Sequence, residues 1–276
     1  MKSSEEFSED DYDVQFETEV GYITDYFDAV EAYNEDGIVV CDGDKVFTKV
    51  RDKANVAMTI SKIEERGLAY LDKTTGSNSK MGLQFDRVLE FFSGIKSKSS
   101  VVMTYPVEKE SMGGNQYLHI DILDEDVQFY CPLLNPSDVS DIPDVDPISC
   151  STQIKVAGSE LKKAIKHCMK VESDSNQKAI FRTKGDVLTV SSESKTHGSV
   201  DKKFHASGPA SEVDLGDHKT TISLGYLNDI KNIIGSADEV TVHIDTDYPI
   251  RLDVPIDVEE DAKIIYIIAP RLKEGE

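Results

Sequence analysis

The 276-residue sequence contains two versions of one half-length pattern, and this repeat limits the possible folds more than any other feature. Four landmarks recur at separations between 137 and 143 residues: Val20 with Ala157, Gly82 with Gly225, Val101 with Val240, and Pro132 with Pro270. A nearly constant offset of half the chain length is what a tandem duplication leaves behind. A chance match of two mixed α and β patterns is the less favoured alternative, because two of the pairs place glycine or proline at both positions.

A segment rich in proline and aspartate, residues 133–149, joins the two halves. Residues 133–148 of this segment, LLNPSDVSDIPDVDPI, hold three prolines, four aspartates and no basic residue. Proline removes backbone donors and biases the preceding residue toward extended geometry. The segment is therefore predicted to be an extended surface connector that carries a few isolated apolar side chains.

Apolar periodicity predicts the same order of elements in each half: strand, helix, strands, helix, strands. Hairpin-linked strands indicate antiparallel sheets, and both helices of a half must then cover one sheet face. The predicted fold is α+β, with two tandem domains at 15–132 and 150–272, an acidic extension expected to be disordered at 1–14, and a tail at 273–276. Helices are expected near 21–33, 85–93, 159–171 and 226–234, and loops over 73–80 and 207–217.

Charge is the unusual bulk property, since 52 acidic residues against 30 basic ones give a formal net charge of −22. Such a chain repels nucleic acid at long range, which taken alone argues against a nucleic-acid partner. Adaptation to a very salty cytoplasm is an alternative reason for the acidity. No apolar run is long enough for a membrane span, and the four scattered cysteines favour free thiols in a reducing compartment. We therefore expect a cytoplasmic protein with no membrane partner.

No pattern of catalytic residues is found. P-loop, GxGxxG, HExxH and GxSxG motifs are absent from the sequence, and the six histidines are dispersed. Acidic clusters lack the EF-hand spacing, so solvated surface is favoured over metal binding. They lie at Asp42/Asp44, Asp124–Asp126, Asp141/Asp144/Asp146 and Asp245/Asp247. We expect a binding protein without catalytic residues, metal or cofactor; a metal-dependent phosphoryl-transfer enzyme that uses an aspartate cluster remains the alternative.

One predicted helix has an unexpectedly basic face. Lys162, Lys163, Lys166 and Lys170 fall on the arc opposite the apolar side chains of residues 159–171 at about 100° per residue. Four lysines on one face of so acidic a chain favour a phosphate-facing surface over an ordinary solvated one. Arg87 and Lys231 on two other predicted helices could extend this surface.

Several segments resemble the archaeal and eukaryotic-type sliding clamp family, proliferating cell nuclear antigen (PCNA). They are DIPDVDP in the connector, GYLNDI, SADEVTV, TDYPIRLDV and IIYIIAPRLKE in the second half, and DKANV at residues 52–56 in the first. The resemblance runs from about Phe16 to Glu276 in the family's order, and its motifs are most specific from Thr221 onward.

The resemblance implies a homotrimeric ring whose six similar domains surround a channel. Helices would line the channel and sheets would form the outer wall. Such a ring encircles double-stranded DNA without sequence specificity. It tethers DNA polymerase, the clamp loader and other replication or repair proteins through short peptide motifs, at the nucleoid. A checkpoint-type relative that assembles only with different subunits remains an alternative.

The resemblance also implies three sets of site residues. The DNA-facing set is Arg87, Lys162, Lys163, Lys166, Lys170 and Lys231. The partner-peptide groove would be lined by Val139, Ile142, Pro249, Ile267, Ala269, Pro270 and Leu272. The subunit interface would pair Val127, Phe129 and Cys131 of one chain with Ser199, Asp201, Lys203 and His205 of the next.

Four residues depart from the family's pattern. Asp25, Asp28 and Glu90 stand where the family often has basic residues, which predicts weaker DNA contact from the first half. Arg51 occupies a position where a groove-lining apolar residue is usual.

Overall fold

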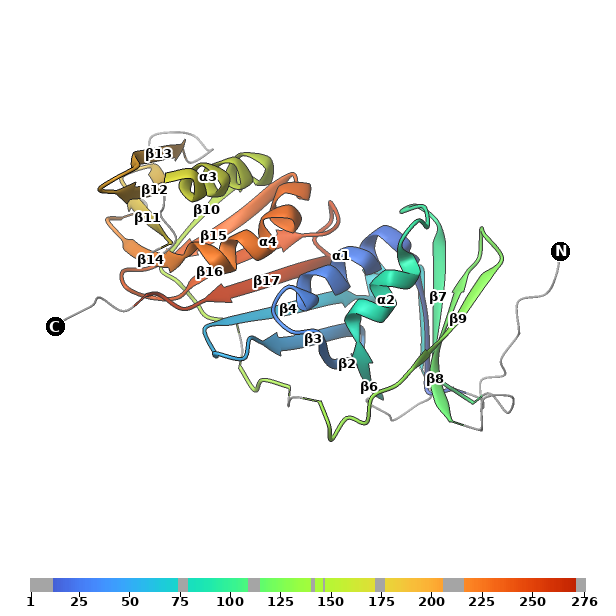
Figure 1. Ribbon diagram of the computed structural model, residues 1–276. Helices are drawn as coiled ribbons and strands as arrows, with labels where there is room; N and C mark the ends of the chain where they lie inside the picture. Colours follow the sequence, from blue (N-terminus) through green and yellow to red (C-terminus); the bar gives the residue numbers. More distant parts are fainter. Residues whose placement is uncertain are drawn as a thin grey trace. The chain divides into compact units, whose positions relative to one another are not determined.

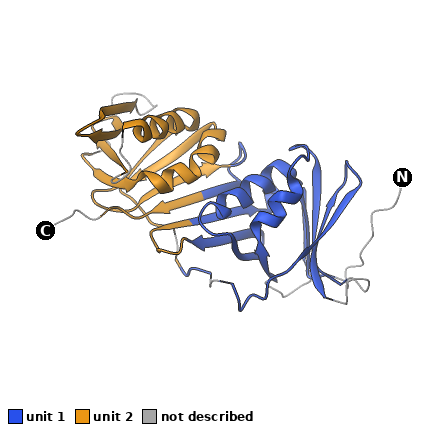
Figure 2. Cartoon of the chain, viewed as in Figure 1, with its two compact units in different colours: residues 1–51, 59–144, 256–264 blue, residues 52–58, 145–255, 265–276 orange. Residues whose placement is uncertain are grey.

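The structure is a computed structural model that describes residues 12–73, 79–108, 115–139, 142–145, 147–171, 177–205 and 216–271. The chain forms two compact units (Figure 2). Unit 1 comprises residues 1–51, 59–144 and 256–264, and unit 2 comprises residues 52–58, 145–255 and 265–276. Strands β4 (Ala57–Glu64) and β17 (Ala262–Ile268) contribute residues to both units. The contiguous domain ranges 15–132 and 150–272 remain a prediction about the duplicated sequence.

Unit 1 contains two antiparallel sheet portions and two helices (Figure 1). Helix α1 spans Val20–Glu31, and helix α2 spans Phe85–Phe92. One sheet has the order β5-β1-β7-β8-β9, and the other portion has the order β6-β2-β3-β4. The strands are β1 (Val14–Glu19), β2 (Asp36–Asp42), β3 (Lys45–Arg51), β5 (Tyr70–Lys73), β6 (Ser79–Gln84), β7 (Ser100–Glu108), β8 (Gln116–Ile122) and β9 (Val127–Pro132), with a 3-10 turn η1 at Glu65–Gly67.

The core of unit 1 lies under its two helices. Helix α1 buries Ile23, Phe27 and Val30 on one face, as its periodicity predicts. Phe85 of α2 meets Phe27 with ring centroids 5.8 Å apart, and the two helices contact each other. Tyr26 is also fully buried, and its hydroxyl is satisfied by Thr48 Oγ1 at 2.7 Å.

Unit 2 repeats this construction. Helix α3 spans Gly158–Val171, helix α4 spans Leu224–Ser236, and the two helices contact each other. The sheet portions have the orders β13-β12-β11-β14 and β10-β15-β16-β17. The further strands are β10 (Thr152–Ala157), β11 (Lys178–Lys184), β12 (Val187–Ser194), β13 (Gly198–His205), β14 (Lys219–Ser223), β15 (Glu239–Ile244) and β16 (Ile250–Pro255).

Element starts support the predicted duplication. The pairs β1/β10 and α1/α3 start 138 residues apart, and α2/α4 and β7/β15 start 139 apart. A backbone hydrogen bond also recurs: Leu134 N donates to Gly82 O in unit 1, and Arg271 N donates to Thr221 O in unit 2, each at 2.8 Å. Gly82 therefore corresponds to Thr221. The Gly82–Gly225 landmark was wrong, because Gly82 lies in β6 whereas Gly225 lies inside α4.

Three strands were missed by the sequence analysis. Residues 73–80, expected as a loop, include the end of β5 and the start of β6, and β14 lies just beyond the loop expected at 207–217. The end of the segment 1–14, which was expected to be disordered, is structured. Within the segment 1–14, Tyr12 is buried with its hydroxyl 2.6 Å from Asp72 Oδ2, and β1 begins at Val14. The remainder of that segment, residues 1–11, lies outside the described residues.

Candidate nucleic-acid interface

The lysine face of α3, defined as Lys162, Lys163, Lys166 and Lys170, is solvent-facing. Lys163, Lys166 and Lys170 are exposed and Lys162 is half-buried. The opposite face of the helix is buried through Leu161, Ala164, Ile165 and Cys168. The structure therefore brings the four lysines together on one side of a helix whose orientation is fixed by its core contacts.

Glu160 in the first turn of α3 binds two lysines at once. Its Oε1 lies 2.6 Å from Lys163 Nζ, and its Oε2 lies 2.6 Å from Lys202 Nζ on β13. Hydrogen bonds from Lys163 and Lys202 lower the pKa of the Glu160 carboxyl to about 2. The carboxylate is therefore ionised at any physiological pH, and sequence reasoning missed its partner Lys202.

The other predicted basic positions differ in how their side chains are held. The stem of Lys162 lies against Gly235 of α4, where an added Cβ would meet Lys162 Cδ at 2.2 Å. Lys231 Nζ donates to the carbonyl and side-chain oxygens of Asn228 at 2.9 and 2.7 Å. Arg87 is exposed on α2 of unit 1. Lys162 and Lys231 thus lie on helices of unit 2 and Arg87 on a helix of unit 1.

The helices of unit 1 carry an acidic surface. Asp25 is half-buried beside Asp28, and burial followed by repulsion from Asp28 raises the pKa of Asp25 to about 6. Burial also raises the pKa of Asp28. Burial raises the pKa of Glu31, and the charges of Asp28, Asp86 and Glu35 raise it further. Repulsion from neighbouring carboxylates therefore adds to burial in raising the pKa of Asp25 and of Glu31, because like charges share one surface.

In unit 1 the connector covers an apolar surface of the sheet. Val139 is only 6% exposed and packs with Ile38 and Val40 of β2. Ile142 is partly buried in the same cluster, together with Phe47 and Leu134. Leu134, Val139 and Ile142 of the connector therefore pack against β2 and β3. Arg51 at the end of β3 is exposed.

The remaining groove residues all belong to unit 2. Ile267 of β17 is buried, and Pro249, Ala269 and Pro270 are half-buried. Ala269 N donates to Val56 O at 2.8 Å, so the end of β17 is held by the 52–58 segment. Leu272 lies outside the described residues. The proposed joint action of these residues with Val139 and Ile142 remains a prediction.

The DKANV motif at residues 52–56, which the sequence analysis identified only as a resemblance, forms a hydrogen-bonded loop within unit 2. The carboxylate of Asp52 in the DKANV motif accepts backbone hydrogen bonds from Val56 at 2.7 Å, Ala57 at 2.8 Å and Ala54 at 3.1 Å. Tyr226 OH of α4 donates to Asp52 Oδ2 at 2.7 Å. Burial raises the pKa of Asp52, but the hydrogen bonds outweigh this effect and the pKa is lowered. The motif therefore fixes a tight loop to a helix that is distant in sequence.

Both strands predicted at the subunit interface are sheet edges among the described strands. β9 ends the order β5-β1-β7-β8-β9, and β13 ends the order β13-β12-β11-β14. Edge strands leave backbone donors and acceptors for pairing. On β13, Ser199, Asp201, Lys203 and His205 are all exposed and lie on alternate positions of one face.

Side chains on β9 are less available than the sequence suggested. Cys131 is fully buried in the core of unit 1, so its side chain is not available to a neighbouring chain. Phe129 stacks on Phe91 with centroids 4.8 Å apart. Val127 is exposed.

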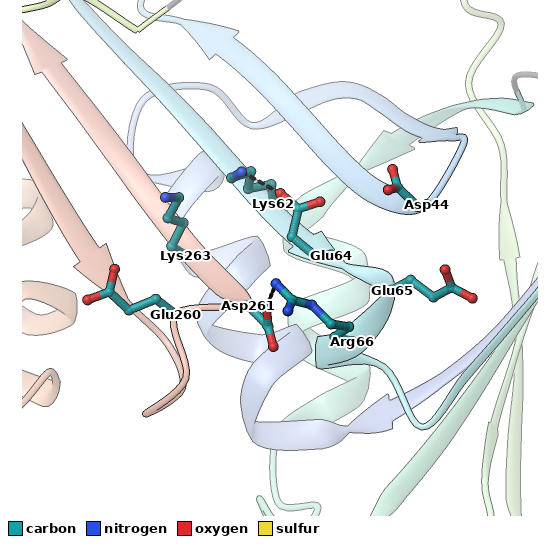
Figure 3. Close-up of a pocket in the computed structure, with 8 residues that line it drawn as sticks. All are labelled: Asp44, Lys62, Glu64, Glu65, Arg66, Glu260, Asp261 and Lys263. Atoms are coloured by element: carbon teal, nitrogen blue, oxygen red, sulfur yellow. Dashed lines mark hydrogen bonds and ion pairs between the residues drawn. The ribbon is translucent and has the colours of Figure 1, made fainter.

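A charged pocket of about 430 Å³ lies elsewhere in unit 1, at the ends of β4 and β17 (Figure 3). Arg66 binds Asp261 at 2.9 Å, and Lys62 pairs with Glu64. The pocket includes none of the predicted site residues, and its own ion pairs satisfy much of its charge. Within the described ranges, no group of three or more His, Cys, Asp or Glu side chains is placed to hold a metal ion. Two members of the Asp141/Asp144/Asp146 cluster, Asp141 and Asp146, lie outside those ranges.

Comparison with known proteins first defines the class of fold. The structure matches that of Archaeoglobus fulgidus PCNA with the C-terminal region of FEN-1 bound, with a TM-score of 0.80 and 22% identity, over 95% of this chain and 100% of the other. It also matches PCNA from Thermococcus kodakaraensis, with a TM-score of 0.76 and 18% identity, over 94% and 100% of the two chains. The predicted fold, two clamp domains with antiparallel sheets and two helices each, is therefore confirmed.

Sequence relatives then give the particular kind of protein that this chain resembles. It is 27% identical over 224 residues to the DNA polymerase sliding clamp of Archaeoglobus fulgidus, covering 80% of this chain and 83% of the relative. It is 24% identical to the DNA polymerase sliding clamp of Methanothrix thermoacetophila, covering 82% and 85%. No family model matches the chain. The predicted resemblance to archaeal sliding clamps is confirmed. No helix in the described part of the chain is long and apolar enough to cross a membrane.

Proposed function

We propose that this protein is a DNA sliding clamp, a processivity factor that encircles double-stranded DNA and tethers replication and repair proteins. The observation that carries the proposal is the exposed lysine face of α3 on a clamp fold, in a chain whose net charge is −22. Exposed lysines on one helix provide local attraction for phosphate while the rest of the surface repels nucleic acid. The protein would act without catalysing a reaction, at the replicating DNA.

Physical reasoning favours a closed ring for such a charge distribution. The affinity that comes from lysine–phosphate contacts falls steeply with salt because counterions are released on binding. A ring is retained by topology, which salt does not screen. A few lysines then need only to centre the duplex and let it slide. Tethered enzymes gain effective concentration at the primer end, and this gain is the source of processivity.

The ring would be a homotrimer in which β9 of one chain pairs with β13 of the next. A head-to-tail contact between two different edges closes into a ring when the rotation allows it. Partner proteins would dock short peptide motifs on the connector and the apolar residues beside it. Static light scattering tests the assembly: a homotrimer has about three times the mass of the 30.6 kDa chain. A monomer that enters a ring only with different subunits would instead favour the checkpoint-type alternative.

Primer extension on a singly primed circular DNA tests the function directly. The reaction contains an archaeal-type DNA polymerase and clamp loader, with and without this protein. We expect the length synthesised per binding event to increase at least about tenfold when the protein is present. An unchanged length, or magnesium-dependent hydrolysis of the DNA that is lost on Asp144→Asn, would contradict the clamp and favour the phosphoryl-transfer alternative.

A further inference from the structure

The three exposed lysines of α3 form one stripe along the helix but have different surroundings. Lys163, Lys166 and Lys170 are three and four residues apart, a spacing that places them above one another on one face. Lys163 lies at the end of the stripe nearest Glu160 and is in ion-pair contact with it. Among the described residues, no carboxylate lies within ion-pair distance of Lys166 or Lys170.

Glu160 connects this stripe to the edge of the sheet. Its second oxygen binds Lys202 of β13, and α3 packs directly against β12 and β13. On β13, Val200, Lys202 and Phe204 lie on the more buried face, and Lys202 Nζ also lies 5.7 Å from the centre of the Phe204 ring. Lys202 thus faces α3, whereas the predicted interface residues of β13 face away from it. One carboxylate holds a lysine of the helix and a lysine of the edge strand together.

Resting on the clamp function proposed above, we infer that Glu160 is a positioning residue that divides the lysines of α3 between two tasks. Lys163 is held with Lys202 to fix β13 against the helix, and Lys166 and Lys170 are the lysines that meet the DNA phosphates. The carboxylate shared by the two ammonium groups compensates one of their two charges and would itself repel a phosphate that approaches Lys163. Lys166 and Lys170 carry no such local compensation.

The salt dependence of DNA binding tests this division. The full-length protein is titrated against a fluorescent 30-base-pair linear duplex over a range of potassium chloride concentrations. Each phosphate contact contributes about 0.9 to the slope of log affinity against log salt. Lys166→Gln and Lys170→Gln should each make the slope shallower, reducing its magnitude by about 1 for each chain that contacts the DNA. Lys163→Gln, which removes the same charge from the same stripe, should leave the slope unchanged.

Glu160→Gln provides a second and opposite test. Loss of the carboxylate releases Lys163 to contact phosphate. The slope should therefore become steeper, its magnitude rising by up to about 1, and affinity at low salt should increase several-fold. A residue with a purely structural role would not steepen the slope. The inference is overturned if Lys163→Gln lowers the slope as much as Lys166→Gln, or if Glu160→Gln leaves it unchanged. Failure of the unmodified protein to bind duplex and to lengthen synthesis would instead contradict the clamp function itself.

Discussion

The helices of the two units have the same fold and opposite charge. Helices α1 and α2 carry five acidic residues and one basic residue, whereas α3 and α4 carry two acidic residues and five lysines. The buried positions of all four helices are apolar, because each helix must fill the same place in its unit's core. Duplication therefore constrained the inner faces and left the exposed faces free to diverge. In a clamp built from this chain, the lysine face of α3 would supply most of the attraction for DNA.

Charge reversal on α3 should have the largest effect. In the double variant Lys166→Glu and Lys170→Glu, two attractions become repulsions, and we expect duplex affinity in 50 mM salt to fall about 100-fold or more, equivalent to about 3 kcal/mol. Fluorescence anisotropy measures the affinity, and light scattering checks that assembly is unchanged. An affinity within threefold of the unmodified protein would show that the charge contrast between units does not determine DNA contact.

A glycine substitution tests how closely the connector packs on β6 of unit 1. A Cβ added at Gly82 would lie 2.5 Å from the carbonyl oxygen of Leu134, so Gly82→Ala must displace the connector backbone and should cost about 2 kcal/mol. Gly225→Ala is the matched control, because its Cβ would meet Ser223 Oγ at an ordinary 3.8 Å. Since alanine favours a helix over glycine by about 0.5–1 kcal/mol, the control should be neutral or stabilising.

Urea denaturation of both variants gives the two free energies of unfolding. Equal losses would contradict the assignment of Leu134 as a close backbone neighbour of Gly82. The comparison also tests the contact between the connector and β6. In unit 2 the position that corresponds to Gly82 is Thr221, whose carbonyl accepts the equivalent hydrogen bond from Arg271.

Local patterns in the sequence predicted much of this arrangement. The four helices and the lysine face follow from apolar periodicity, because a helix places residues of one face at fixed spacing. Strands β5, β6 and β14 were missed: β5 and β14 are only four and five residues long, and the sequence of β6, SKMGLQ, alternates weakly. The turn-like sequences beside them favoured loops.

Contacts between distant residues could not be predicted in this way. Glu160 meets Lys202 across 42 positions, and Asp52 meets Tyr226 across 174. No local pattern indicates which of several lysines or tyrosines a carboxylate will bind. The burial of Cys131 likewise depends on which face of β9 packs on the core, and a strand with large side chains on both faces does not reveal this.

Reversing charge on unit 1 should produce a smaller change in the opposite direction. Asp28 and Glu90 both reach solvent, although the packing around Asp28 is enough to raise its pKa, so Asp28→Lys with Glu90→Lys should preserve the fold. If the helices of unit 1 face the same duplex as α3, the variant should bind about tenfold more tightly in 50 mM salt and show a steeper salt dependence. Anisotropy titrations in parallel with the α3 variant provide the measurement. Unchanged binding would place the acidic surface away from the DNA.

The smallest effect concerns the cost of keeping the acidic surface ionised. The pKa of Asp25 is about 6 in the folded protein, against 3.8 for an ordinary aspartate, so the folded state binds more protons between these values. The free energy of unfolding should therefore decrease as pH rises from about 4 through 6, and remain lower above that range. Asp25→Asn removes this penalty and should stabilise the protein at pH 7.5 by about 1 kcal/mol after allowance for partial exposure.

A matched carboxylate in unit 2 sharpens this last prediction. Burial raises the pKa of Asp229 on α4, but a hydrogen bond from Asn228 and the charge of Lys231 oppose the rise. Asp229→Asn should therefore stabilise the protein less than Asp25→Asn at pH 7.5, and neither variant should gain stability at pH 4. Thermal melts at both pH values test this, with an expected increase of about 2–4 °C for Asp25→Asn at pH 7.5. An equal gain for the two variants would mean that lysine on the helices of unit 2 does not relieve the repulsion that unit 1 retains.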